Sequence, residues 1–367
     1  MKESMGMKIL VGVFILLIIV AAILLGIKVI NNNENKNELE GQIQIGEENN
    51  ETEGTTIVEV KEPQIFKGDD RPIAVMIDNH KGAMPQAGLN NAYLVYEIIV
   101  EGGETRLMAL FKGTQLDKIG PVRSSRHYFL DYALENDAIY VHFGWSPQAQ
   151  SDITKLGVNN INGISESSKS FWRTKDKYAP HNVATSTEKI LEIANRKGYR
   201  TTSTKESVLN YVGDEFELES DIEATKITIP YSNSNTVEYE YDNVTKRYTR
   251  YSRDTKQVDW TTGETVTTKN IIIVKCSNWK ISGDTSGRQT IDNVKALKGY
   301  YITNGKAIEI TAEKSTRDSQ TVYKDLEGNE IDVNDGNTFI QICPLDAEVE
   351  IEPGKPEPEV EVTNVIS

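Results

Sequence analysis

The chain has 367 residues, of which 38% are apolar and 26% charged, so it is long enough to bury more than one hydrophobic core. Its formal charge of −15 argues against a general nucleic-acid-binding protein, because phosphate contacts need a basic surface that this composition does not supply. The same charge disfavours adhesion to anionic lipid headgroups, except through a membrane segment.

An uncharged apolar run at residues 9–27 is the first feature of the chain. About twenty such residues span a bilayer core as a helix, and the run is longer than the roughly 7–15 apolar residues of a cleaved signal peptide. We therefore predict a transmembrane helix over 9–30 that stays in place as a signal anchor, with a cleaved signal as the alternative. Lys2 and Lys8 precede the run, whereas mostly Asn and Glu follow it. The positive-inside rule then leaves residues 1–8 in the cytoplasm and the rest outside, on a single-pass protein of the cell membrane.

Two acidic stretches flank the part of the chain that is predicted to fold. Residues 31–63 are rich in Asn, Glu and Gly and contain no aromatic residue, so they cannot bury enough apolar surface to order themselves. We predict a disordered acidic linker there, which holds the folded part away from the membrane. Residues 346–367 alternate Pro with Glu and Val, which predicts an extended acidic tail.

The first region, residues 64–215, mixes strand and helix patterns. Continuous apolar runs predict buried strands at 72–78, 93–100, 105–111 and 138–143. Helices are predicted where a serine precedes a helical apolar pattern, namely after Ser124 or Ser125, after Ser146 and after Ser186. The mixture predicts an α/β or α+β domain.

The second region, residues 220–345, is predicted to be mostly β. Strand-like runs recur at 227–229, 237–241, 247–251 and 271–275. Asn304–Gly305 fits a two-residue type I′ turn, which predicts a hairpin over 300–310. A similar turn signal around residue 328 predicts another hairpin over 322–333.

Only two cysteines occur, Cys276 and Cys343, each at the end of a strand-like run. Outside the cytoplasm a disulfide is allowed, but two cysteines in a chain of this length are more often separate buried thiols, and both alternatives stay open. Because no cysteine precedes position 276, we expect no lipid-modified cysteine near the N-terminus.

All four histidines fall between positions 80 and 181. Histidine serves in proton transfer, metal ligation and anion contacts near neutral pH, but no pair here has the spacing of a metal motif, so no metal site is predicted.

Arg123 and Arg126 bracket a predicted helix start, where guanidinium groups bind carboxylate or phosphate. The alternative is that these arginines pair with Asp78, Glu97, Glu101 or Glu104 and serve only stability. The predicted polar groove is lined by Asp78, His80, Arg106, Arg123, Arg126, His127, His142, Trp145 and His181.

Several segments resemble the signature segments of the YerB-like putative lipoprotein family, namely Arg71–His80, Pro85–Leu89, Glu101–Arg106, Gly120–Arg126, Tyr140–Pro147 and Ala179–Asn182. The similarity extends over about residues 65 to 345. It implies an extracytoplasmic location in Gram-positive bacteria, two consecutive domains of unknown function, and no established chemistry. The membrane helix predicted in place of a lipidation cysteine departs from that family's pattern.

Three hypotheses of function follow from these patterns. The first is a membrane-anchored extracytoplasmic protein that binds an envelope component through the polar groove: a partner protein, a wall polymer or an anionic glycan fragment. The second is an enzyme acting on peptidoglycan or another wall polymer, with His127 or His142 as general base and Arg123 stabilising negative charge. The third is a non-catalytic scaffold in which the histidines and arginines are structural. None of the three calls for a cofactor or a nucleic acid, and we favour the non-enzymatic first hypothesis.

Overall fold

A computed structural model of the chain describes residues 61–354. The predicted cytoplasmic segment, the membrane helix over 9–30, nearly all of the linker and the end of the tail lie outside the described residues. Among residues 61–354, no helix is both long and apolar enough to span a membrane. The membrane anchor therefore stays a prediction from the sequence.

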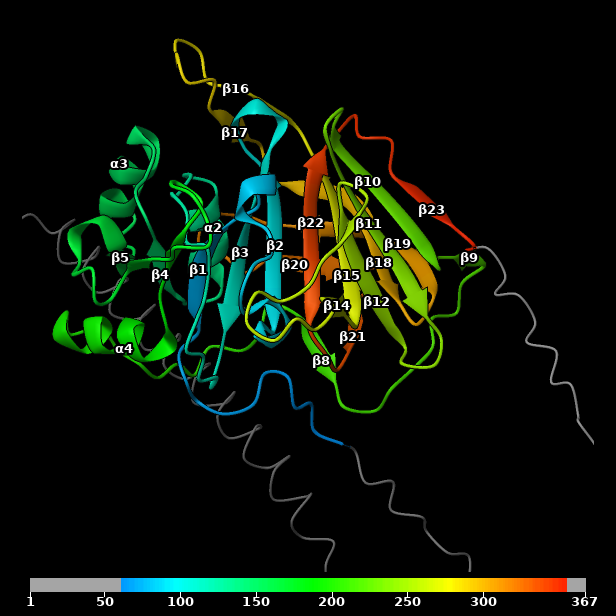
Figure 1. Ribbon diagram of the computed structural model, residues 1–367. Coiled ribbons are helices and arrows are strands. Elements are labelled where there is room, and N and C mark those ends of the chain that lie inside the picture. Colours follow the sequence, from blue (N-terminus) through cyan, green and yellow to red (C-terminus); the bar gives the residue numbers. More distant parts are fainter. Residues whose placement is uncertain (1–60, 355–367) are drawn as a thin grey trace, which may run out of the picture. The chain divides into compact units, whose positions relative to one another are not determined.

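An eleven-stranded sheet forms the centre of the fold, in the order β20-β19-β18-β15-β22-β2-β3-β1-β4-β5, with β9 paired to β19 (Figure 1). One half uses β1 (Ile73–Asp78), β2 (Leu94–Ile99), β3 (Thr105–Phe111), β4 (Ile139–His142) and β5 (Asn160–Asn162). The other half uses β9 (Ile222–Glu223), β15 (Asn270–Cys276), β18 (Ala296–Thr303), β19 (Lys306–Glu313), β20 (Val322–Lys324) and β22 (Thr338–Pro344).

The two predicted regions meet inside this sheet. β22 lies parallel to β2, from Leu94 opposite Thr338 to Ile98 opposite Ile342. The mixed α/β character of the first region and the strand-rich character of the second are confirmed. The two regions share one hydrogen-bonded sheet, which the sequence patterns did not indicate, because an apolar run predicts a strand without naming its partner.

A second, six-stranded sheet is built from the later part of the chain. Its order is β13-β12-β11-β10-β23, with β14 paired to β12. Its bounds are β10 (Lys226–Ser232), β11 (Asn235–Asp242), β12 (Arg247–Ser252), β13 (Thr255–Lys256), β14 (Thr267–Thr268) and β23 (Glu350–Glu352). β23 lies within the predicted extended tail, and its residues 350–352 pair antiparallel with β10.

Three helices contact the sheets: α2 (Phe129–Glu135), α3 (Pro147–Lys155) and α4 (Thr187–Arg196). The predicted caps of the last two are confirmed, since Ser146 and Ser186 each accept a backbone hydrogen bond from the residue three positions later. The predicted cap at Ser124 or Ser125 is wrong, because α2 begins at Phe129 without a side-chain cap. The backbone before it is instead extended, with the Arg123 N–H donating to Met76 O at 2.8 Å.

Short elements complete the fold. The 3₁₀ turns are η1 (Lys81–Ala83), η2 (Leu89–Asn91), η3 (Glu101–Gly103) and η4 (Gly163–Ser165), and the small strand pairs are β6 (Trp172–Arg173) with β7 (Val183–Ala184), β8 (Asn210–Val212) with β21 (Asp332–Asn334), and β16 (Asn278–Lys280) with β17 (Gln289–Ile291). The hairpin at Asn304–Gly305 is confirmed, and both residues have positive φ. The hairpin predicted over 322–333 is present as a short one: Lys324 lies antiparallel to Glu330, and the Ile331 N–H donates to Tyr323 O at 3.0 Å. Its two arms also pair outward, β20 with β19 and β21 with β8.

The central sheet buries a separate apolar cluster on each face. One cluster includes residues of α4 and of the second sheet, and the other includes residues of α2 and α3. Cys343 belongs to the first cluster and Cys276 to the second, and both are free and buried. The two thiols therefore point to opposite faces of the sheet, which excludes a disulfide between them in this fold.

Candidate functional site

The carboxyl ends of β1, β2 and β4 lie along one edge of the central sheet. β1 runs parallel to β4, and β1 and β2 are both antiparallel to β3. In open α/β sheets this edge is where ligand sites are usually built. Asp78 ends β1 there, directly opposite Arg106 at the start of β3.

Asp78 is the centre of a charged cluster, and only 4% of its side chain is exposed. Its Oδ2 accepts a hydrogen bond from His181 Nδ1 at 2.7 Å and lies 3.1 Å from Arg123 Nε. Its Oδ1 accepts from the His80 backbone N–H at 3.2 Å. One buried carboxylate therefore orients both a histidine ring and a guanidinium group.

His80 supports the ring of His181. The two imidazoles stack with centroids 4.4 Å apart and planes 9° from parallel. His80 Nδ1 accepts from the Gly82 N–H at 3.0 Å, which caps the η1 turn. A Cβ at Gly82 would lie 3.3 Å from atoms of both rings, so the glycine leaves room for the stack.

Arg106 and Arg126 sit deeper and share Glu101. Glu101 Oε2 accepts from Arg126 Nε at 2.9 Å, Oε1 accepts from Arg126 Nη2, and Oε1 lies 3.3 Å from Arg106 Nη2. Partial burial alone raises the pKa of Glu101, but the Arg126 hydrogen bond and the charges of both arginines outweigh it and lower the pKa to about 2. Burial, reinforced by the neighbouring Arg126 charge, lowers the pKa of Arg106 to about 10. These two arginines fit the predicted alternative of structural pairing.

Arg123 and His181 instead present bonding groups outward. Their side chains are 26% and 19% exposed. Within residues 61–354, the terminal nitrogens of Arg123 and Nε2 of His181 have no protein partner. Three arginines stand beside two carboxylates, so the local charge is positive in an otherwise acidic chain. We call Asp78, His80, Glu101, Arg106, Arg123, Arg126 and His181 the Asp78 cluster.

Two predicted histidines lie apart from this cluster. His142 is fully buried, and its ring nitrogens bond Gly144 O at 2.8 Å and Asn160 Oδ1 at 3.2 Å. Burial lowers the pKa of His142 to about 4, which keeps the ring neutral. Trp145 packs beside it, with ring centroids 5.4 Å apart. Both residues therefore serve packing, and His142 has no free nitrogen for a substrate.

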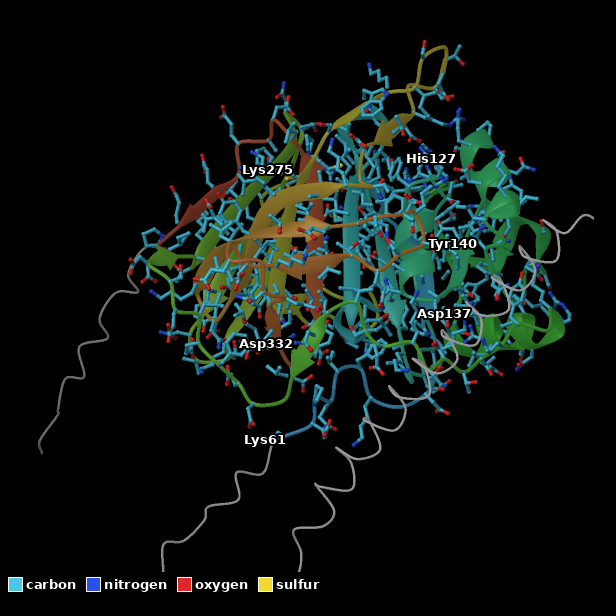
Figure 2. The ribbon with its side chains drawn as sticks, turned by 180° about the vertical axis from the view of Figure 1, so that it is seen from behind. Lys61, His127, Asp137, Tyr140, Lys275 and Asp332 are labelled. Carbon is cyan, nitrogen blue, oxygen red and sulfur yellow. The ribbon has the colours of Figure 1, made fainter. Side chains whose placement is uncertain are left out.

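His127 lines a different hollow, near the β16–β17 hairpin (Figure 2). Its Nε2 bonds Thr290 Oγ1 at 2.9 Å, and burial lowers its pKa. The hollow has a volume of about 210 Å³ and also contains Asp131 and Arg317, which pair at 2.7 Å. The structure thus brings together six of the nine predicted groove residues and leaves out His127, His142 and Trp145.

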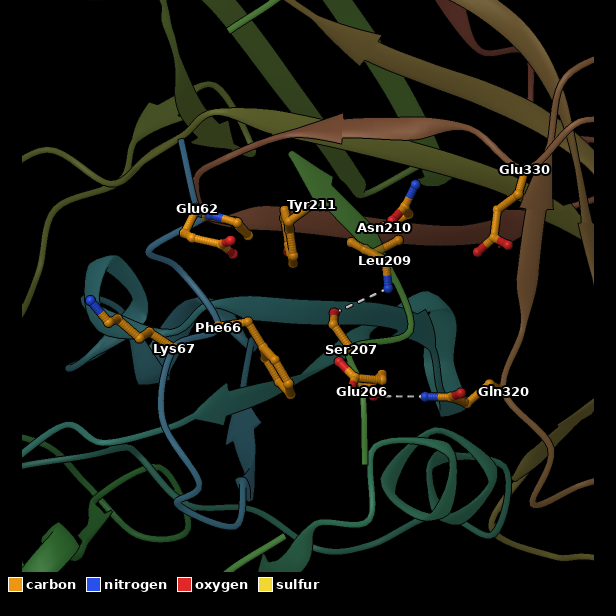
Figure 3. A pocket seen from close by; sticks show the side chains of 11 residues that line it. Glu62, Phe66, Lys67, Glu206, Ser207, Leu209, Asn210, Tyr211, Gln320 and Glu330 are labelled. Atoms are coloured by element: carbon orange, nitrogen blue, oxygen red, sulfur yellow. Dashed lines mark hydrogen bonds between the residues drawn. The ribbon is translucent and has the colours of Figure 1, made fainter. Parts of the chain in front are cut away.

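A larger cavity also lies away from the Asp78 cluster. It has a volume of about 600 Å³ and lies beside Glu62 and Phe66, where the described chain begins (Figure 3). Two of its polar side chains are bonded to the protein itself: Ser207 Oγ accepts from the Leu209 N–H, and Gln320 Nε2 donates to Glu206 O. The polar groups of this cavity do not converge on one point. Within residues 61–354, no group of three or more metal-binding side chains is arranged to hold an ion.

Comparisons with known proteins agree with this architecture. Residues 58–200 match the family model described as "Protein of unknown function (DUF3048) N-terminal domain", and residues 227–340 match its C-terminal domain. The chain is 34% identical over 289 residues to "Putative lipoprotein YerB" of Bacillus subtilis, covering 76% of this chain and 82% of that protein. The crystal structure of B. subtilis YerB superposes with a TM-score of 0.69, covering 77% of this chain and 94% of that one. The chain belongs to the YerB-like putative lipoprotein family, whose function is unknown.

Proposed function

We propose that the protein is a non-enzymatic, extracytoplasmic binding protein, held at the membrane by the predicted helix over 9–30. Its ligand is an oxyanion, phosphate or carboxylate, on a component of the cell envelope. The outward groups of Arg123 and His181 contact this anion, and the rest of the Asp78 cluster holds them in place. The name of the B. subtilis relative supports the extracytoplasmic location.

One observation carries the proposal: a buried carboxylate fixes Arg123 through Nε and leaves both terminal nitrogens free. A guanidinium group held in this way is preorganised to bind an oxyanion through two parallel hydrogen bonds from its terminal nitrogens. Little side-chain entropy is then left to lose on binding. Arg106 and Arg126 add positive charge near the Arg123 guanidinium group, and Glu101 neutralises part of that added charge. Since Arg123 and His181 stay partly exposed, the anion has access from solvent.

An enzymatic role is the second candidate, and the Asp78–His181 hydrogen bond favours it. A carboxylate on Nδ1 orients the imidazole and leaves Nε2 outward, which is how a general base is positioned. In this candidate the general base is His181, in place of the His127 or His142 that the sequence predicted. Binding is preferred because the other carboxylate of the Asp78 cluster, Glu101, is paired with Arg106 and Arg126.

Calorimetric titration with glycerol 3-phosphate and with glucuronate tests the proposal, since the two probes present a phosphate and a carboxylate. We expect at least one to bind, and Arg123→Gln to weaken that binding by about ten- to a hundredfold, as for loss of a charge-assisted hydrogen bond. Arg196→Gln is the matched control, because Arg196 is a surface arginine of α4 paired with Glu166. Equal affinities for wild type and Arg123→Gln would refute the proposed site.

A further inference from the structure

The β16–β17 hairpin carries an exposed tryptophan at the edge of the hollow that His127 lines. The loop of this hairpin projects from the body of the fold (Figure 1), and Trp279 is 51% exposed. Trp279 lies directly opposite Thr290 in the hairpin, so the two side chains share one face, with their Cβ atoms about 4.5–5.5 Å apart. Thr290 lines the hollow and is hydrogen-bonded to His127 Nε2 at 2.9 Å. The indole of Trp279 therefore stands beside the hollow.

Inside the hollow, a set of polar side chains is held in fixed positions. Asp131 is 2% exposed, and its two oxygens accept from Arg317 Nε at 2.7 Å and from Asn293 Nδ2 at 3.1 Å. Arg317 is held further, because its Nη1 donates to Asp152 Oδ2 at 2.7 Å and its Nη2 to the His127 carbonyl at 3.1 Å. Since Asn293 turns its nitrogen toward Asp131, the other atom of its amide is the oxygen.

Two polar atoms of the hollow are left available to a ligand. Asn293 lines the hollow and is 5% exposed, and its Oδ1 makes no hydrogen bond within residues 61–354. This oxygen is nevertheless not sealed from solvent, and the same holds for His127 Nδ1. An unpaired acceptor that solvent reaches can gain a hydrogen bond from a ligand donor. The hollow thus offers an amide oxygen and an imidazole nitrogen beside an exposed aromatic ring.

The charged groups around the hollow favour a neutral ligand. Asp131 and Asp152 share Arg317, and Asp292 pairs with Lys295 at 2.6 Å. Among these groups, three carboxylates stand beside two cations, so they leave no excess positive charge for an anion. The hollow therefore differs from the Asp78 cluster, where the local charge is positive.

A sugar ring matches an aromatic surface beside neutral hydrogen-bonding groups. The face of an indole carries partial negative charge, whereas the C–H groups on a face of a pyranose ring carry partial positive charge, so the two stack. Hydroxyl or acetamido groups at the edge of the ring can then reach the hollow. Its volume of about 210 Å³ is below the roughly 300–1,000 Å³ of sites for drug-sized ligands, so it accepts a single sugar unit or a part of one.

We propose that Trp279 and the hollow beside it bind a neutral pyranose sugar of a glycan. The sugar ring stacks on the Trp279 indole, one of its hydroxyl or amide groups donates to Asn293 Oδ1, and a second group bonds His127 Nδ1. The site shares no residue of the ligand contact with the Asp78 cluster beyond the chain itself, so the anion proposal can fail while the sugar site stands.

The test uses the full-length chain in a detergent without a sugar headgroup and ligand-observed NMR titrations with N,N′-diacetylchitobiose, a neutral disaccharide. We expect millimolar binding, and Trp279→Ala should weaken it at least about fivefold because the stacking surface is lost. Trp279→Phe keeps an aromatic ring and should bind within about threefold of wild type. Leu326→Ala is the matched control, since Leu326 is 70% exposed in a different turn, and it should leave binding unchanged.

A second measurement on the wild-type protein needs no variant. Saturation of the aromatic protons of the protein should pass to the ring C–H protons of the disaccharide more strongly than to its acetyl methyl protons. Four results would each overturn the proposal: no binding of the disaccharide, equal binding by wild type and Trp279→Ala, no preferred transfer to the ring protons, or equally tight binding of N-acetyl-alanine methylamide. The last result would assign this surface to a peptide.

Discussion

Glu97 and Arg250 form an ion pair of 2.6 Å in which neither side chain is exposed to solvent. Glu97 lies on β2 of the central sheet and Arg250 on β12 of the second sheet, so the pair ties the two sheets together. Glu97 Oε1 also accepts from Asn79 Nδ2 at 3.0 Å and from Thr105 Oγ1 at 2.7 Å. Such a pair is costly to break because the remaining charge stays buried.

Glu97→Gln should therefore destabilise the fold by about 3–5 kcal/mol in urea unfolding of a fragment that spans residues 59–367. Glu104→Gln is the matched control, since Glu104 is 30% exposed and pairs with Arg253 at 2.5 Å. The control should cost about 0–1 kcal/mol. Similar losses in both variants would show that the buried pair contributes no more than a surface pair.

His142 should make stability depend on pH. Burial lowers its pKa in the fold to about 4, from an ordinary value of 6.5. The unfolded chain therefore binds the extra proton first, and stability present above pH 6.5 is lost as the pH falls toward 4. The loss is at most about 3 kcal/mol. His142→Gln should lose this contribution, so its unfolding free energy should change less between pH 7 and pH 4; parallel curves would contradict the assignment.

The contribution of Glu101 to the stability of the fold should change with pH in a more acidic range than that of His142. Its pKa is lowered to about 2 from 4.5, so its contribution is complete above pH 4.5 and disappears as the pH falls toward 2. With the side chain 28% exposed, we expect Glu101→Gln to cost about 2 kcal/mol at pH 7, after allowance for screening by solvent. Unfolding of wild type and variant at pH 7 and pH 3 measures this. The difference should shrink at pH 3, and a constant difference would contradict the ion-pair origin.

Cys276 and Cys343 should remain thiols even in an oxidising compartment. They lie on the neighbouring strands β15 and β22 but face opposite sides of the sheet. Burial raises the pKa of Cys276 to about 11 and that of Cys343 to about 12, so neither forms the reactive thiolate near neutral pH. Alkylation and mass spectrometry after unfolding without reductant should label two cysteines per chain. A mass two hydrogens lower, with no labelling, would reveal a disulfide.

Local features of the fold were predictable from the sequence, because their causes lie within a few residues. The Ser146 and Ser186 caps and the Asn304–Gly305 turn are examples. Distant contacts were not predictable. Ser125 has the composition of a helix cap, but its Oγ accepts from Tyr140 Oη at 2.8 Å and its N–H donates to Gly144 O. These tertiary bonds override the local preference.

The site was predictable as a set of polar residues at element ends, but its grouping was not. Asp78 and His181 are 103 positions apart, and their hydrogen bond depends on how the loop before β7 returns to β1. His142 carries the same sequence signal at the end of β4, yet Gly144 and Asn160 use both of its nitrogens. Strand position thus marks candidate residues, while the bonds made by the neighbouring loops decide which of them face a ligand.

Urea unfolding of wild type and Arg123→Gln, each with and without glycerol 3-phosphate, tests the proposed anion site most directly. The Arg123 side chain is 26% exposed, and Asp78 keeps its hydrogen bonds from His181 and from the His80 N–H, so the variant should lose at most about 1 kcal/mol of stability. Ligand at 100 times the wild-type Kd should stabilise wild type by about 2.7 kcal/mol and the variant, with its ten- to hundredfold weaker binding, by only about 0.4–1.4 kcal/mol. A large loss of stability in the variant, or equal stabilisation of both proteins by the ligand, would contradict the proposal that Arg123 binds the anion.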